Sequence, residues 1–203
     1  MHTDHTTQLL FNMPFPSKTY SLIVNCGAVM TAMMLAGCVS APPNPAPDIP
    51  VTLQPGKNER VLAILPAVGV QIYECRTKPG GANDHEWAFV APEADLFDRQ
   101  GKKIGKHYAG PHWEAADGSR VVASAKARVD SPSPEAIPWL LLTARPAGPN
   151  GNFSKVSSIL RINTIGGMPP RSGCDASNGG AKARVKYSAD YYLFVRTASQ
   201  RAE

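Results

Sequence analysis

Several familiar catalytic and binding signatures are missing from the 203-residue sequence. It has no G-x-S-x-G around a nucleophilic serine, no glycine-rich phosphate loop and no G-x-G-x-x-G dinucleotide fingerprint. It also lacks the aromatic stacking platforms with which proteins bind single-stranded nucleic acid. We therefore expect neither a cofactor nor a nucleic-acid partner, and the sequence alone indicates no specific reaction.

The N-terminal region has a long uncharged stretch. It runs from Tyr20 to Gly37, follows Lys18 and ends in small residues, which is typical of a secretory signal peptide. The stretch is too short and too weakly apolar for a transmembrane helix, which needs about 20 apolar residues. We expect residues 1–37 to be a signal peptide whose true start is Met13.

The signal peptide ends in "LAGC", residues 35–38, which resembles the bacterial lipobox. In that motif a signal peptidase cuts before the cysteine, and the thiol carries a diacylglycerol. We expect Cys38 to be lipidated; the alternative is a signal anchor with an incidental cysteine. The residue after Cys38 is Val39 and not an aspartate. By resemblance to lipoproteins of Gram-negative bacteria, this favours attachment to the periplasmic side of the outer membrane. Residues 38–50 are proline-rich and polar, typical of a tether.

The chain has only four cysteines. Cys26 leaves with the signal peptide and Cys38 carries lipid, so Cys75 and Cys174 remain. In an oxidising compartment we expect these two to pair. The alternative is a reactive thiol pair, which lacks the C-x-x-C spacing that would support it.

Residues 51–203 have the patterns of a single β-rich domain. Nineteen prolines and seventeen glycines disfavour long helices. Asp117-Gly118 is a hairpin signal, and the alternation after it places Val121, Ala123, Ala125, Ala127 and Val129 on one strand face. "PWLLLTA" is typical of a strand buried on both faces or of a short core helix, whereas "SKVSSILRINTIGG" favours a strand. We predict an all-β fold, an antiparallel β-sandwich or closed barrel of about eight or nine strands with little helix outside the signal peptide.

The stretch "KHYAGPHWEAADGSR", Lys106 to Arg120, contains most of the candidate functional residues. Strand alternation places His107 on the more polar face, with Lys103. A metal site would need His107 and His112 with a third ligand from Glu114, Asp117 or His85, but their spacing is not diagnostic. The candidate catalytic residues are His107, Glu114 and Asp117, and the candidate ligand-binding residues are His107, Trp113 and Asp117.

"RINTIGG" is the second candidate stretch. In a strand, Arg161 and Asn163 point the same way, and such a pair can bind a carboxylate, a phosphate or a sugar hydroxyl. The alternative is that Arg161 pairs with a carboxylate on a neighbouring strand.

Six features taken in order resemble the family called domain of unknown function 3455, exported proteins of bacteria and fungi. They are "GVQIYECR", "WAFVAPEADLFD", "GKKIGKHYAGPHWEAADGSRVV", "IPWLLLTA", "RINTIGG" and Cys174. The resemblance covers nearly all of residues 61–195. It implies an exported β-rich domain and supports a Cys75–Cys174 bridge, but it implies no catalytic residue.

Our leading hypothesis is a non-enzymatic, lipid-anchored periplasmic domain that binds a small molecule or an envelope polymer. The first alternative is a metal- or carboxylate-assisted hydrolase of envelope polymers that uses His107 with Glu114 or Asp117. The second is a structural subunit of an envelope complex.

Overall fold

The computed structural model describes residues 48–81 and 83–197. The predicted signal peptide, Cys38 and most of the tether lie outside these residues. The described chain forms eight strands and two short 3-10 helices, which are η1 (Val51–Leu53), β1 (Glu59–Thr77), β2 (His85–Phe97), β3 (Lys103–Tyr108), β4 (His112–Ala115), β5 (Arg120–Val129), β6 (Trp139–Pro146), β7 (Val156–Gly166), η2 (Ala176–Asn178) and β8 (Lys182–Arg196).

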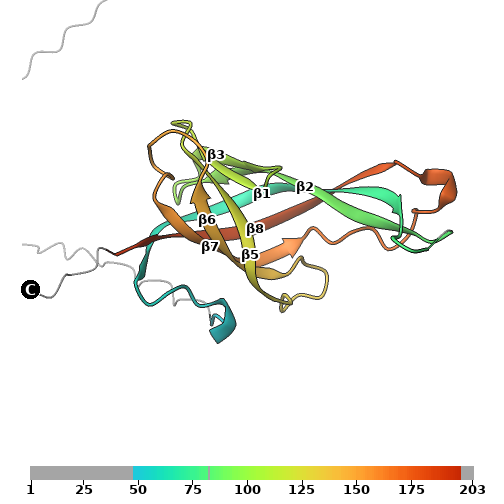
Figure 1. The fold of residues 1–203 in the computed structure, drawn as a ribbon, viewed down its shortest axis with the longest axis horizontal. Helices are drawn as coiled ribbons and strands as arrows, with labels where there is room; N and C mark the ends of the chain where they lie inside the picture. The colour runs from blue at the N-terminus through green and yellow to red at the C-terminus, as the bar shows by residue number, and fades with distance from the viewer. Residues whose placement is uncertain (1–47, 82, 198–203) are drawn as a thin grey trace, which may run out of the picture. The chain divides into compact units, whose positions relative to one another are not determined.

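The strands form one closed antiparallel barrel in chain order, with β8 returning to pair with β1 (Figure 1). Each strand pairs with the next one along the chain, so short turns make most of the connections. The all-β prediction and its closed-barrel alternative are confirmed. Both ambiguous stretches, "PWLLLTA" and "SKVSSILRINTIGG", form strands, β6 and β7.

Two hydrophobic clusters lie on opposite sides of the barrel wall. Inward-facing side chains such as Leu65, Leu96, Ile159 and Leu193 form the interior cluster. The outer cluster packs under η1, where Leu53 is completely buried; it contains Leu53, Trp139, Leu141, Leu160, Ile162 and Phe194. β6 is therefore buried on both faces, which explains its unbroken apolar sequence.

The alternation predicted for β5 is correct only in its first half. Val121 and Ala123 belong to the interior cluster, but Ala127 packs against the outer cluster. The register with β6 shifts between Ala125 and Ala127, so Lys126 is an extra residue in the ladder. A β-bulge of this kind moves every later side chain to the other face.

One side of the barrel wall is incomplete. β3 pairs with β2 only over Ala94–Phe97, and β4 pairs with β5 only as far as Val122. β1, β2 and β8 continue together beyond these pairings, down to Thr77 and His85 (Figure 1). Between the free edge of β2 and the free edge of β5, the described chain supplies no strand, so the interior opens sideways.

A disulfide joins Cys75 of β1 to Cys174, in the loop before β8, with the two Cα atoms 5.3 Å apart. The predicted bridge is therefore present. The disulfide lies where β1 and β8 extend past the incomplete wall. It ties the loop that contains η2 to the end of β1. None of the helices in the described part of the chain has the length and hydropathy to span a membrane.

Candidate functional site

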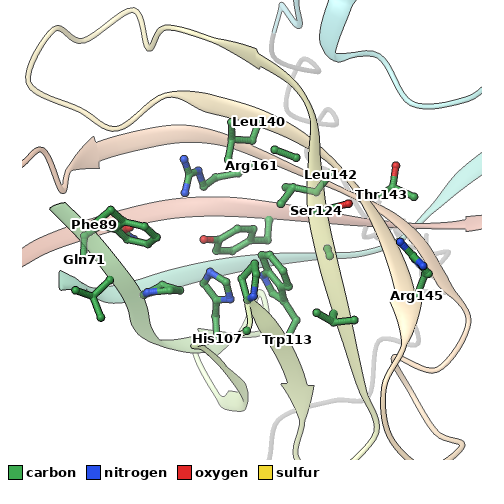
Figure 2. Close-up of a pocket in the computed structure, with 18 of the residues that line it drawn as sticks. Gln71, Phe89, His107, Trp113, Ser124, Leu140, Leu142, Thr143, Arg145 and Arg161 are labelled. Carbon is green, nitrogen blue, oxygen red and sulfur yellow. The ribbon is translucent and has the colours of Figure 1, made fainter. Parts of the chain in front are cut away.

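A cavity of about 810 Å³ opens at the incomplete side of the barrel (Figure 2). Its size lies within the usual range for small-molecule sites, roughly 300–1,000 Å³. All eight strands contribute residues to its lining. Its lining comprises Gln71, Phe89, Val90, Pro92, His107, Gly110, Pro111, Trp113, Val122, Ala123, Ser124, Ala125, Leu140, Leu142, Thr143, Arg145, Pro146, Arg161 and Tyr191.

Three aromatic rings pack together in the inner wall. His107 of β3 is the direct strand partner of Trp113 of β4, and their rings stack with centroids 4.0 Å apart. Tyr191 of β8 meets both rings edge to face, at 5.2 Å from His107 and 5.5 Å from Trp113. His107 is only 3% exposed and Trp113 only 1%. The two strands thus present a rigid aromatic surface to the cavity.

The prediction that His107 lies on a polar face with Lys103 is wrong. The register between β2 and β3 shifts at Leu96/Phe97, which leaves Ile104 as an extra residue in β3. This bulge turns Gly105 and His107 inward, while Lys106 remains exposed.

His107 is neutral at physiological pH. Burial lowers the pKa of its imidazole to about 3, although a hydrogen bond to a backbone carbonyl acts in the opposite direction. Nδ1–H donates this bond to the carbonyl of His112 at 2.8 Å. The bond fixes the tautomer, so Nε2 carries no proton and can only accept a hydrogen bond.

Arg161 supplies a positive charge to the cavity. It lies opposite Leu140 of β6 and Tyr191 of β8, and its Nη2 donates to the carbonyl of Pro138 at 2.8 Å. Within the described residues no carboxylate forms an ion pair with Arg161, and neither aspartate nor glutamate lines the cavity. The alternative that Arg161 pairs with a carboxylate on a neighbouring strand is therefore wrong for the described residues.

Two buried donors at the cavity lack acceptors. Gln71 of β1 is 3% exposed, and among the described residues neither its Nε2 nor Nε1 of Trp113 has a hydrogen-bond partner. Gln71 packs beside Gly167, whose φ of 84° and missing side chain leave room for it. Buried donors are nearly always paired in proteins, so two orphans at one cavity are informative.

The carboxylates of the candidate catalytic set lie elsewhere. Glu114 faces the outer side, where Tyr108 Oη donates to it at 2.6 Å and Lys106 pairs with it at 3.1 Å. The Tyr108 hydrogen bond is the main reason that the pKa of Glu114 is lowered. The structure does not bring Glu114 together with His107 in the cavity.

Asp117 belongs to the turn that precedes β5. It accepts hydrogen bonds from the Ser119 hydroxyl at 2.5 Å and from the Asn152 N–H at 2.8 Å, and the Ser119 bond is the largest cause of its lowered pKa. Ser119 Oγ in turn accepts from the Phe153 N–H. These bonds fasten one loop to another, and Asp117 does not line the cavity.

Arg161 and Asn163 do not point the same way, contrary to the prediction. Asn163 has a φ of 52° and lies where the register with β8 shifts between Ile162 and Ile165. Its amide donates to Asp190 at 2.8 Å on the exposed side. The bulge therefore separates Asn163 from the cavity that Arg161 lines.

The two histidines of the central stretch also take different positions. His107 lies in the interior, whereas Nδ1–H of His112 donates to the carbonyl of Ala109 in the turn. No group of three or more metal-ligating side chains occurs among residues 48–81 and 83–197.

Several cavity residues had no signal in the sequence analysis. Gln71, Phe89 and Tyr191 come from strands β1, β2 and β8, far apart along the chain. In β8, Ala183, Val185, Tyr187, Ala189 and Tyr191 fall on one strand face by simple alternation, and the last three belong to the interior cluster. This alternation is the sequence signal that could have placed Tyr191 inside the barrel.

The model of the family described as "Protein of unknown function (DUF3455)" matches residues 55–195. No curated protein matches the chain. The match covers the whole barrel from β1 to β8 apart from the last residue of β8, and it includes every residue of the cavity lining and both bridged cysteines. The match covers more than half of the chain, so the chain belongs to this family of proteins of unknown function, DUF3455.

Proposed function

We propose that this chain is a lipid-anchored periplasmic protein that binds a small molecule in the barrel cavity without catalysing a reaction. One observation supports the binding role above all others. The cavity brings together an unpaired cation, two buried donors without acceptors and a broad apolar wall. Such a combination costs stability in an empty protein and is explained by a ligand that supplies the missing partners.

The hydrolase alternative requires His107 beside a carboxylate. The carboxylates of Glu114 and Asp117 are instead held by hydrogen bonds outside the cavity. A neutral imidazole with a pKa of about 3 is also a poor general base near neutral pH. These features favour binding over catalysis.

Attachment to the outer membrane is supported by the sequence, through "LAGC" and the residue after Cys38. It is tested by labelling the full chain with a fatty-acid precursor in a Gram-negative host. We expect label on the wild type and none on Cys38→Ser. A protein that stays in the outer-membrane fraction after Cys38→Ser would refute the lipid anchor.

Binding is tested with the full chain in phosphatidylcholine nanodiscs, with empty nanodiscs as the blank. Calorimetry measures decanol, decanoate and decyltrimethylammonium, which share an apolar chain and differ in head group. Ala125→Trp places an indole at an exposed position in the cavity lining, and we expect it to abolish binding. Lys126→Trp adds the same group one residue along, outside this lining, and should leave binding intact. Failure of the wild type to bind any probe would refute the proposed function.

A further inference from the structure

We infer that the cavity takes an anionic amphiphile, a molecule with one acidic head group and an apolar body. The inference rests on the proposed binding function and names the ligand class for the same site. The acidic head is a carboxylate or a phosphate, and Arg161 is its main partner.

The charge of Arg161 gives the first argument. Arg161 Nε and Nη2 both donate to the carbonyl of Pro138, at 3.2 and 2.8 Å, which holds the guanidinium at the cavity wall. That carbonyl carries no formal charge, and the described residues offer no carboxylate to Arg161. A half-buried guanidinium with free donors binds carboxylate and phosphate oxygens strongly.

The orphaned donors give the second argument, which is independent of charge. The Gln71 amide and the Trp113 indole are at least 97% buried, since their exposures are 3% and 1%, and both line this cavity. Each needs a hydrogen-bond acceptor, and neither finds one in residues 48–81 and 83–197. Because both residues line the same cavity, a bound head group rich in acceptor oxygens would lie near donors that the described chain leaves unpaired.

The remaining walls define the body of the ligand. Pro92, Leu140 and Leu142 line the cavity, and Phe89 stands at it with 54% of its surface exposed. Exposed aromatic surface of this extent at a cavity marks a place where an apolar ligand would be covered. In Figure 2, Phe89 and Gln71 are drawn to the left of His107, while Ser124, Thr143 and Arg145 are drawn to the right.

Arg145 provides a matched comparison within the same cavity. It also lines the cavity, but it alternates along β6 with Leu142 and Ala144 of the interior cluster and is exposed to solvent. Water already solvates its charge, so a bound anion gains little from it. We therefore expect the head group to bind at Arg161 and not at Arg145.

The test measures head-group preference in the wild-type full chain, in the same nanodiscs. We expect decanoate or decyl phosphate to bind at least about 10-fold more tightly than decanol, because a hydrogen bond to a charged group contributes a factor of roughly 10 to 100. Whichever of the two acids binds more tightly identifies the head as carboxylate or phosphate. Decyltrimethylammonium should bind most weakly.

Variants then assign the preference to residues. Arg161→Met should remove the advantage of the acidic probe, a loss of about 10-fold or more, and change decanol affinity much less. Arg145→Met should reduce the advantage of the acidic probe much less than Arg161→Met does. Arg161→Lys retains the charge and should keep part of the preference, which shows that a loss in Arg161→Met comes from charge and not from misfolding.

The outcomes distinguish a failure of the proposed binding function from a failure of the anionic ligand class. If decanol binds as tightly as both acids, the cavity is an apolar site and the anionic class is wrong, while the proposed function stands. If Arg161→Met and Arg145→Met weaken the acids equally, the head group is not at Arg161 and the inference is overturned. If no probe binds the wild type, the proposed function itself fails.

Discussion

The two ends of the barrel interior are built in opposite ways. At the closed end, Leu65, Leu96, Ile159 and Leu193 are all at most 2% exposed and form an unbroken apolar core. At the open end, Gln71, His107 and Arg161 replace aliphatic side chains, and a cavity takes the place of packed atoms. Two strands contribute to both sets, since Leu65 and Gln71 lie on β1 and Ile159 and Arg161 lie on β7.

This difference indicates that the closed end contributes most of the packing that stabilises the fold. Dry aliphatic packing is favourable, whereas buried polar groups without partners are costly. A chain selected only for stability would continue the closed-end pattern through the whole barrel. The open end departs from that pattern at several strands at once, as expected of a site that has a function.

The largest effect should come from deleting core volume at the closed end. Leu193→Ala removes a completely buried side chain, and we expect a loss of about 2–5 kcal/mol in the free energy of unfolding. Leu140→Ala removes the same side chain at the cavity, where part of it already faces open space, so its loss should be clearly smaller. Denaturant unfolding of the oxidised protein measures both. Equal losses would show that the two ends do not differ in packing.

The disulfide should rank next, and it acts at the open end. Cys75 and Cys174 are separated by 99 residues, and removing such a bridge typically costs about 2–4 kcal/mol. We expect the double variant Cys75→Ala/Cys174→Ala to melt at the temperature of the reduced wild type, well below the oxidised wild type. Reductant should not affect the double variant. If the oxidised and reduced wild type melt together, the extension of β1 and β8 does not depend on its bridge.

The closed end was more predictable from sequence than the open end. The alternation at the start of β5, the β-favouring residues of β7 and the many prolines and glycines led to the all-β class and the barrel alternative. The pairing of the two cysteines followed from their number and the expected compartment.

The open end depends on β-bulges, which periodicity does not reveal. One bulge turns His107 inward, and another sends Asn163 outward and leaves Arg161 at the cavity. A single extra residue reverses the face of each later side chain, so a local error of one position changes a whole site. Gln71 gave no signal because its role depends on strands that are distant in sequence.

A pH effect of intermediate size should reveal the buried neutral histidine. Because the folded pKa of His107, about 3, lies below the ordinary value of 6.5, the unfolded chain binds the proton first as the pH falls. Unfolding stability should therefore fall below pH 6.5 by about 1.4 kcal/mol per pH unit, or about 2 kcal/mol between pH 6.5 and 5. Denaturant unfolding at several pH values measures this slope.

His107→Gln should flatten that slope, even if the variant is less stable at every pH. Asp117→Asn is the control. A carboxylate with a lowered pKa contributes stability that is lost only below its ordinary value of 3.8, so this variant should retain the slope between pH 6.5 and 5. A slope that survives in His107→Gln would contradict the burial of a neutral imidazole at the open end.

The smallest change in stability is expected from Arg161→Met without ligand, and it tests the comparison most directly. The substitution removes a half-buried cation for which the described chain supplies no carboxylate partner, and this favours folding. It also removes two hydrogen bonds to Pro138. These effects oppose each other, so the free energy of unfolding should change by less than about 1 kcal/mol. Denaturant unfolding with and without saturating decanoate measures the balance. At a ligand concentration of about 100 times the wild-type Kd, the wild type should gain roughly 2.7 kcal/mol, and the variant, whose Kd is about 10-fold larger, about 1.4 kcal/mol or less. A loss above about 2 kcal/mol without ligand would mean that Arg161 holds β7 in place. The polar residues of the open end would then stabilise the fold, as the aliphatic residues of the closed end do.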